Sequence, residues 1–180
     1  GNPTADERRL VDGFYAGAIE PVWIDDGGTL TGPGRQAVDL LAGADSHGLD
    51  PDDYRVDADP VDPATFEVAL TLSMLRYLGD ISVGRINPAT LGFDLPAGLD
   101  RAALPALLRE NAAAGRTTAA VNAAMPTVGN YDGLRHALAR YRALSQHPEP
   151  ESLPTPGTSI RVGEPLEWAV ALRVRLETFG

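Results

Sequence analysis

The residues with the clearest capacity for chemistry lie in one short stretch, residues 44–54, which reads ADSHGLDPDDY. A histidine beside a serine could serve as the base for a hydroxyl nucleophile, but sequence neighbours rarely meet in the geometry that such a pair requires. No Gly-x-Ser-x-Gly turn surrounds Ser46, so we do not expect a serine nucleophile. The chain has no cysteine, which excludes thiolate nucleophiles, thiolate metal sites and disulfides.

Metal binding by the same stretch is also disfavoured. If Gly48 took the glycine position of an EF-hand calcium loop, His47 and Tyr54 would stand at positions that require carboxylates or other oxygen ligands. A zinc site would need His47, His136 and His147 to converge, and their spacing contains no close pair. We therefore expect neither a metal nor a cofactor.

Aspartates cluster at residues 25–26 and 50–53, and convergent carboxylates can carry out acid–base catalysis. Both clusters stand beside Gly or Pro, where carboxylates commonly cap turns. We interpret residues 44–54 as a helix-to-helix connector. In this interpretation Gly48 takes a left-handed conformation, Leu49 folds back onto the preceding helix and Asp50-Pro51 begins a short helical turn.

Three aromatic side chains, Tyr15, Trp23 and Tyr54, are candidates for contact with a glycan or a partner protein, because aromatic faces stack on sugars. The alternative is that they close the core where an extended segment at residues 21–24 meets the first two helices. A Trp23→Ala variant separates the two alternatives. Lost stability with unchanged binding favours the core, and lost binding with unchanged stability favours a ligand site.

Composition and charge restrict the classes of partner. Of the 180 residues, 43% are hydrophobic and 22% charged, which is typical of a chain that folds. Fifteen basic and 25 acidic residues give a net charge of -10, which repels a phosphate backbone and argues against nucleic-acid binding. No apolar run approaches the roughly 18 to 20 residues that span a bilayer, so we expect no membrane insertion.

Capping signals and apolar periodicity predict a mainly α protein, a single helical bundle around a buried central helix, with a short extended segment near residues 21–24. The central helix should start at Asp62-Pro63 and run to about Val83, because it is apolar on nearly all sides apart from a narrow polar strip. That strip contains Glu67, Thr71, Arg76 and Asp80. The other predicted helices begin with a capping box at Thr4–Glu7, at residues 31–33, after Asp100, after the caps Thr117-Thr118 and at Asn130.

The C-terminal part of the chain has a different organisation. The helix from Asn130 places Tyr131, Leu134, Leu138 and Tyr141 on one stripe, which we expect to face inward. We predict one domain over residues 1–147, a Pro-rich linker over residues 148–159, and the beginning of a further module over residues 160–180. That last segment has a helical pattern at Trp168, Ala171, Leu172 and Leu176.

Four stretches between Phe14 and Leu144 carry a resemblance to a known family: FYAGAIEPVWIDDGGTLT, HGLDPDDY, LRYLGDISVGRINPATLGFDLP and NYDGLRHALARYRAL. Together they resemble the scaffold domain of the large, multi-domain bacterial murein L,D-transpeptidases. Residues 160–180 are similar to the opening helix of a peptidoglycan-binding module. In that family HGLDPDDY belongs to the scaffold, and the catalytic Ser-His-Gly-Cys segment lies in another domain.

The resemblance implies a non-catalytic scaffold region that positions a catalytic domain of the same protein, with peptidoglycan or partner proteins as candidate contacts. No catalytic residue transfers to this chain, so we expect it to have no enzymatic activity. The implied location is extracytoplasmic, periplasmic in a Gram-negative cell. The alternative is a stand-alone peptidoglycan-binding or protein-interaction module without activity. The net charge of -10 argues against strong binding to acidic wall polymers.

Overall fold

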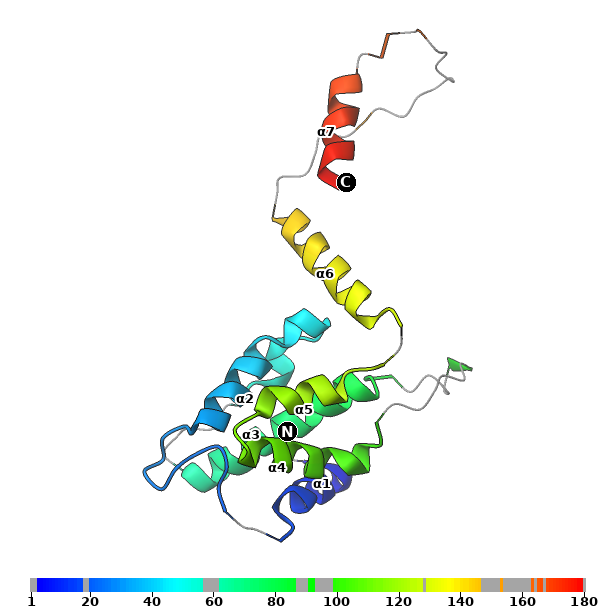
Figure 1. Cartoon of the computed structure of the whole chain (residues 1–180). Coiled ribbons are helices and arrows are strands. Elements are labelled where there is room, and N and C mark those ends of the chain that lie inside the picture. The colour runs from blue at the N-terminus through cyan, green and yellow to red at the C-terminus, as the bar shows by residue number, and fades with distance from the viewer. Residues whose placement is uncertain are drawn as a thin grey trace. The chain divides into compact units, whose positions relative to one another are not determined.

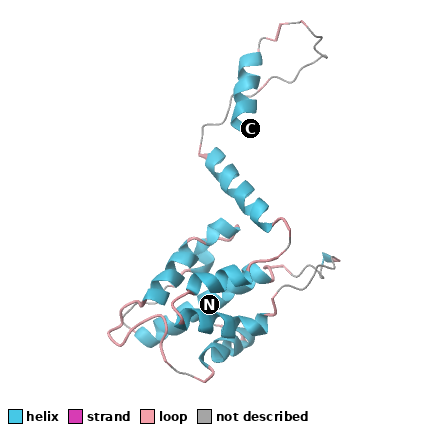
Figure 2. Cartoon of the chain, viewed as in Figure 1, coloured by secondary structure: helices cyan, strands magenta, loops and turns pink. Residues whose placement is uncertain are grey.

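The computed structural model describes residues 3–17, 20–56, 62–86, 91–92, 99–127, 129–146, 153, 163, 165–166 and 168–179. Within these residues the protein is helical and contains no strand (Figure 2). The only pairing of extended segments in this described part is an antiparallel bridge between Ile24 and Leu30. The mainly α fold predicted from the sequence is confirmed.

The first two helices begin where their caps predict. Helix α1 (Ala5–Tyr15) starts with a complete capping box, in which the Thr4 hydroxyl accepts from the Glu7 backbone and the Glu7 carboxylate accepts from the Thr4 backbone. Helix α2 (Gly32–Ala42) is capped by the Thr31 hydroxyl, which also donates to the Val22 carbonyl at 2.7 Å. The start of α2 is therefore tied to the extended segment before it.

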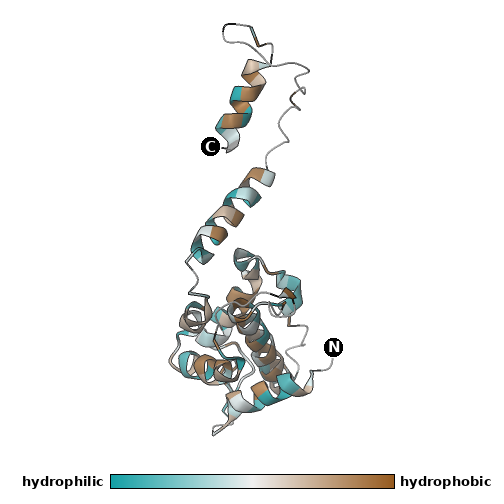
Figure 3. Ribbon diagram, turned by 90° about the vertical axis from the view of Figure 1, so that its right-hand side faces the viewer, coloured by the Kyte–Doolittle hydropathy of each residue, from teal (hydrophilic) through white to brown (hydrophobic). Residues whose placement is uncertain are grey.

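Helix α3 (Pro63–Ser82) is the central element of the compact unit formed by residues 1–135. Its N-cap is Asp62, and it packs against α1, α2, α4 (Leu104–Ala113) and α5 (Thr117–Ala124) (Figure 1). Figure 3 shows that brown, apolar residues predominate along the long central helix. Leu70, Met74 and Leu78 have no exposed surface. The prediction that this helix forms the axis of the core is confirmed.

The caps of α4 and α5 differ from each other. Asp100 caps the short 3-10 helix η4 (Arg101–Ala103), which leads directly into α4, as predicted. The predicted Thr117-Thr118 cap of α5 is wrong, because the N-cap is Arg116 and makes no side-chain cap. Thr117 lies in the first turn with no exposed surface, and its hydroxyl lies 3.4 Å from the Pro33 carbonyl oxygen. Tertiary contact with α2 takes the place of capping at this position.

The stretch at residues 44–54 is the predicted connector. It forms two 3-10 helices, η1 (Ala44–His47) and η2 (Pro51–Tyr54), separated by Gly48 with a left-handed φ of 78°. The Leu49 backbone N–H donates to the Ala44 carbonyl at 3.3 Å, and Leu49 packs against the core. The prediction of a left-handed glycine followed by a folded-back leucine and a helical turn is confirmed.

The last two helices are α6 (Tyr131–Ser145) and α7 (Ala169–Phe179). The chain divides into two compact units at residues 135 and 136, so α6 begins in the first unit and continues in the second. The prediction that the whole stripe on α6 faces inward is wrong: Tyr131 packs against His47, but Leu134 and Tyr141 are 63% and 65% exposed and no α6 residue is fully buried. The linker at residues 148–159, apart from Leu153, lies outside the described residues, and the three domain limits remain predictions.

Candidate functional site

The serine and histidine at residues 46–47 do not form a catalytic pair. The His47 Nδ1 forms a 2.7 Å hydrogen bond with the Tyr131 hydroxyl, and its ring packs against the rings of Tyr131 and Tyr77. Burial lowers the pKa of His47, and the nearby Arg135 guanidinium lowers it further. Ser46 contributes its carbonyl oxygen, which accepts from the Arg135 Nε at 3.2 Å. Through these two residues the connector at residues 44–54 contacts the start of α6.

One aspartate of each cluster, Asp25 and Asp50, caps a turn, as the sequence context indicates. The Asp25 carboxylate accepts from the backbone N–H groups of Gly27 and Thr29 at 3.0 and 2.9 Å. The Asp50 carboxylate accepts from the backbone N–H two residues later. Among the described residues no group of three or more His, Asp or Glu could hold a metal ion; His147 lies outside this part of the chain.

The three candidate contact aromatics lie mainly in the core. Trp23 is 0% and Tyr54 2% exposed, whereas Tyr15 is half-buried. The Trp23 ring stacks on Phe14 with 5.7 Å between ring centroids, and the Tyr54 hydroxyl donates to Asp80 at 2.7 Å. A buried ring presents no face to a sugar, so the packing alternative describes Trp23 and Tyr54 in this structure.

A buried carboxylate, Glu67 on α3, holds two of these aromatics, Tyr15 and Trp23, in place. The residue is 5% exposed although the sequence placed it on a polar strip. Its Oε1 accepts from the Val22 backbone N–H at 2.7 Å and from the Tyr15 hydroxyl at 3.0 Å. Its Oε2 accepts from the Trp23 and Ile24 backbone N–H groups at 2.9 and 3.2 Å. Four donors offset the cost of burying a carboxylate, and they fix the extended segment onto α3.

Thr71, one helical turn after Glu67, completes this network. Its hydroxyl accepts from the Trp23 Nε1 at 2.8 Å, lies 2.8 Å from the Tyr15 hydroxyl and donates to the Glu67 carbonyl at 3.0 Å. Burial raises the pKa of the Tyr15 hydroxyl, so that group stays protonated. Sequence reasoning missed the network. The i, i+4 spacing of Glu67 and Thr71 within an otherwise apolar helix is the signal that could have found it.

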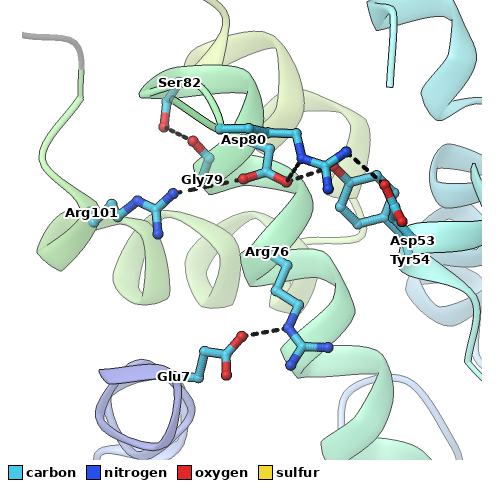
Figure 4. A network of polar contacts seen from close by, with 9 residues as sticks. Glu7, Asp53, Tyr54, Arg76, Gly79, Asp80, Ser82 and Arg101 are labelled. Carbon is cyan, nitrogen blue, oxygen red and sulfur yellow. Dashed lines mark hydrogen bonds and ion pairs between the residues drawn. The ribbon is translucent and has the colours of Figure 1, made fainter. Parts of the chain in front are cut away.

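The second polar feature is a charged cleft of about 340 Å³ lined by residues of α1, η2, α3, η4 and α4 (Figure 4). The Arg76 Nε donates to the Glu7 carboxylate at 2.6 Å. The Asp80 carboxylate, which accepts from Tyr54, also lies 3.8 Å from Arg85 and 3.7 Å from Arg101. The cleft thus contains three carboxylates and three guanidinium groups: Glu7, Asp53, Asp80, Arg76, Arg85 and Arg101.

The carboxylates of the cleft are arranged for ion pairing. The hydrogen bond from Arg76 is the main cause that lowers the pKa of Glu7 to about 2, so this carboxylate is ionised throughout the physiological range. A group with so low a pKa is a weak base and holds no proton to donate at neutral pH. Asp53 accepts from the Arg85 Nη1 at 2.7 Å. The charged groups of the cleft are therefore better arranged to bind a charged ligand than to transfer a proton.

The protein is a helical domain in which the candidate catalytic and metal-binding residues make structural contacts: His47 packs against α6, and Asp25 and Asp50 cap turns. A family model described as Scaffold domain matches residues 9–138, which is more than half of the chain. The chain therefore belongs to the Scaffold domain family, and the predicted resemblance to a scaffold domain is confirmed. The match does not reach residues 160–180, where the predicted module remains a prediction.

Two further findings concern relatives and membranes. Searches among curated proteins and among solved structures returned no match. Of the helices that the structure describes, none combines the length and the hydropathy that a membrane span requires.

Proposed function

We propose that this chain is the non-catalytic scaffold region of a cell-wall L,D-transpeptidase and that it positions the catalytic domain of the same protein. The family match over residues 9–138 carries the proposal, and the four stretches that resemble murein L,D-transpeptidase scaffolds specify the enzyme class. Its partner is the catalytic domain in cis, and peptidoglycan is the candidate ligand of the whole protein. Its location is extracytoplasmic, periplasmic in a Gram-negative cell.

The internal contacts support a positioning role. A scaffold must present its surface in a fixed arrangement, and here a buried carboxylate ties residues 22–24 to the central helix through three backbone hydrogen bonds. Among the described residues no buried side-chain nitrogen or oxygen lacks a hydrogen-bond partner. Such full satisfaction of buried polar groups favours one rigid arrangement of the helices.

The experiment is an activity assay of the purified chain on isolated sacculi, followed by chromatography of the muropeptides. We expect neither new cross-links nor hydrolysis, because the residues available for acid–base work are turn caps and ion pairs. Cross-link formation or sacculus hydrolysis by this chain would contradict the proposal.

A sedimentation assay with the same sacculi tests the alternative, a stand-alone wall-binding module. We expect most of the chain to remain in the supernatant at physiological salt, because its net charge is -10 and its candidate stacking residues Trp23 and Tyr54 are buried. Saturable co-sedimentation that persists at high salt would favour the wall-binding module instead.

A further inference from the structure

The hydrogen-bonding capacity of the charged cleft is unevenly used. Each of its three carboxylates already accepts a hydrogen bond from the protein (Figure 4). Glu7, for example, accepts from the Arg76 Nε at 2.6 Å and from the Thr4 backbone N–H at 2.7 Å, and Asp80 accepts from the Tyr54 hydroxyl. The acidic groups are therefore occupied, and the cleft offers little to a cation.

The unused groups are donors on two arginines. Within the part of the chain that the structure describes, Arg76 donates only through its Nε. The nearest carboxylate oxygen to Arg101, on Asp80, is 3.7 Å away, which is too long for a hydrogen bond. Their side chains are 35% and 52% exposed, so both guanidinium groups can be reached from solvent. A planar guanidinium with free N–H groups is complementary to a carboxylate.

The charge around these arginines limits the kind of anion. The three guanidinium groups of the cleft are balanced by three carboxylates, and the whole chain carries a net charge of -10. A polyanion would be repelled by this field, whereas a single carboxylate adds only one negative charge and can pair directly with a guanidinium group. A compact, singly charged acid therefore fits the cleft better than a polyphosphate or a nucleic acid.

The walls of the cleft add an apolar requirement. Two half-buried leucines line it beside the charged groups, Leu10 from α1 and Leu72 from α3, whereas the lining residues Leu75 and Leu104 are only 1% and 0% exposed. A volume of about 340 Å³ is at the small end of ligand pockets. The ligand that matches both the free guanidinium groups and the leucines carries a carboxylate next to a small apolar group, as a peptide C-terminus does.

We propose that this cleft binds a peptide C-terminus, with the carboxylate held by Arg76 and Arg101 and the adjoining apolar side chain placed against the leucines. The proposal uses only the contacts of the cleft and does not depend on the proposed scaffold function. Gly79 lies at the same wall, where an added Cβ would come within 3.4 Å of the Arg101 guanidinium carbon.

The test is an NMR titration of the ¹⁵N-labelled chain with N-acetyl-alanyl-alanine and with its C-terminal amide. The two probes differ only in the carboxylate. We expect saturable shifts of the Arg76 and Arg101 Nε–H signals with a Kd of about 1 mM or tighter, and at least about tenfold weaker binding of the amide. Equal binding of acid and amide, or shifts that do not saturate, would overturn the proposal.

Acetate serves as a third probe, because a carboxylate could also come from a small organic acid. We expect acetate to bind at least about tenfold more weakly than the acetylated dipeptide, since it cannot reach the leucines. If acetate binds as tightly as the dipeptide, the apolar wall contributes nothing and the assignment to a peptide C-terminus is wrong.

Variants separate ligand binding from a purely structural role of the ion pairs. Arg101→Gln should weaken binding of the dipeptide at least about tenfold, whereas Arg8→Gln, which removes the same charge from an exposed position on α1, should leave the Kd within about twofold. Glu7→Gln breaks the ion pair with Arg76 but keeps the guanidinium, so binding should be equal or tighter. Circular dichroism checks that each variant folds. Equal Kd values for the Arg101 and Arg8 variants would refute the site.

Discussion

Replacement of Glu67 by Gln tests how the extended segment at residues 22–24 is held on α3. Each carboxylate oxygen has two donors: Oε1 accepts from Val22 and from the Tyr15 hydroxyl, and Oε2 accepts from Trp23 and Ile24. Glutamine has the same shape but replaces one oxygen by an amide nitrogen, which cannot accept. If the amide nitrogen takes the Oε2 position, the Trp23 and Ile24 N–H groups lose their acceptor. If it takes the Oε1 position, the Val22 N–H loses its acceptor, whereas the Tyr15 hydroxyl can accept from the amide and donate to Thr71.

The size of the effect follows from this count. A buried backbone N–H without a partner costs about 1–3 kcal/mol, and the two remaining bonds lose their charge assistance. Removal of a buried charge returns part of this free energy, because the neutral amide is less costly to bury. We therefore expect Glu67→Gln to lower the free energy of unfolding by about 2–4 kcal/mol, a large part of the stability of a typical domain.

The assay is urea unfolding followed by far-UV circular dichroism, with Glu110→Gln as the matched control. Glu110 lies on α4 with its side chain exposed, so the same chemical change there should alter the free energy of unfolding by no more than about 0.5 kcal/mol. If Glu67→Gln costs no more than Glu110→Gln, the carboxylate does not organise the segment and the hydrogen-bond account is refuted.

Three further predictions use the same unfolding assay. Gly34→Ala should lower the free energy of unfolding by about 1–3 kcal/mol, because the added Cβ would overlap the Trp23 carbonyl oxygen. The control Gly32→Ala has nothing within 4 Å of the new Cβ and should change the free energy of unfolding by less than about 1 kcal/mol. Equal effects of the two variants would contradict the packing of Gly34 against Trp23. Trp23→Ala should cost about 3–5 kcal/mol without changing sacculus binding, and unchanged stability with lost binding would favour a ligand role. The pKa of His47 in the folded protein is lowered from 6.5, so the unfolded state takes up a proton first as the pH falls. The free energy of unfolding should therefore decrease below about pH 6.5, and His47→Gln should flatten that decrease. An unchanged pH profile in this variant would show that His47 does not cause the decrease.

The features that the sequence predicted well are governed by short-range interactions. The capping box at Thr4–Glu7, the N-cap Asp62 and the left-handed Gly48 each depend on residues within a few positions of one another. The length and apolar character of α3 likewise predicted its central position. Local propensity and periodicity therefore sufficed for most helix starts and for the axis of the core.

The polar interior could not be predicted in the same way. Glu67 was placed on a narrow polar strip of the central helix, yet three of its donors come from residues 22–24, more than 40 positions earlier in the chain. The charged cleft likewise combines Glu7, Asp53, Asp80 and Arg101 from separate elements. The spacing of polar residues on α3 can mark positions such as Glu67 and Thr71, but it does not identify partners that lie so far away along the chain.

The apolar stripe of α6 shows that a helical pattern alone does not predict burial. The spacing of Leu134 and Tyr141 correctly indicated a helix, but both side chains are largely exposed. Periodicity identifies the residues that share a face of a helix, and it does not establish that another element covers that face. The same holds for Leu176 on α7, which is helical as predicted and 63% exposed.

The most direct test of the proposed function is to read the encoding gene in frame past the codon for Gly180. The scaffold account predicts that the frame continues through a peptidoglycan-binding module into a catalytic segment with a histidine followed by Ser-His-Gly-Cys. A stop codon directly after Gly180, or a continuation without that cysteine segment, would contradict the account and make a stand-alone binding module the leading interpretation.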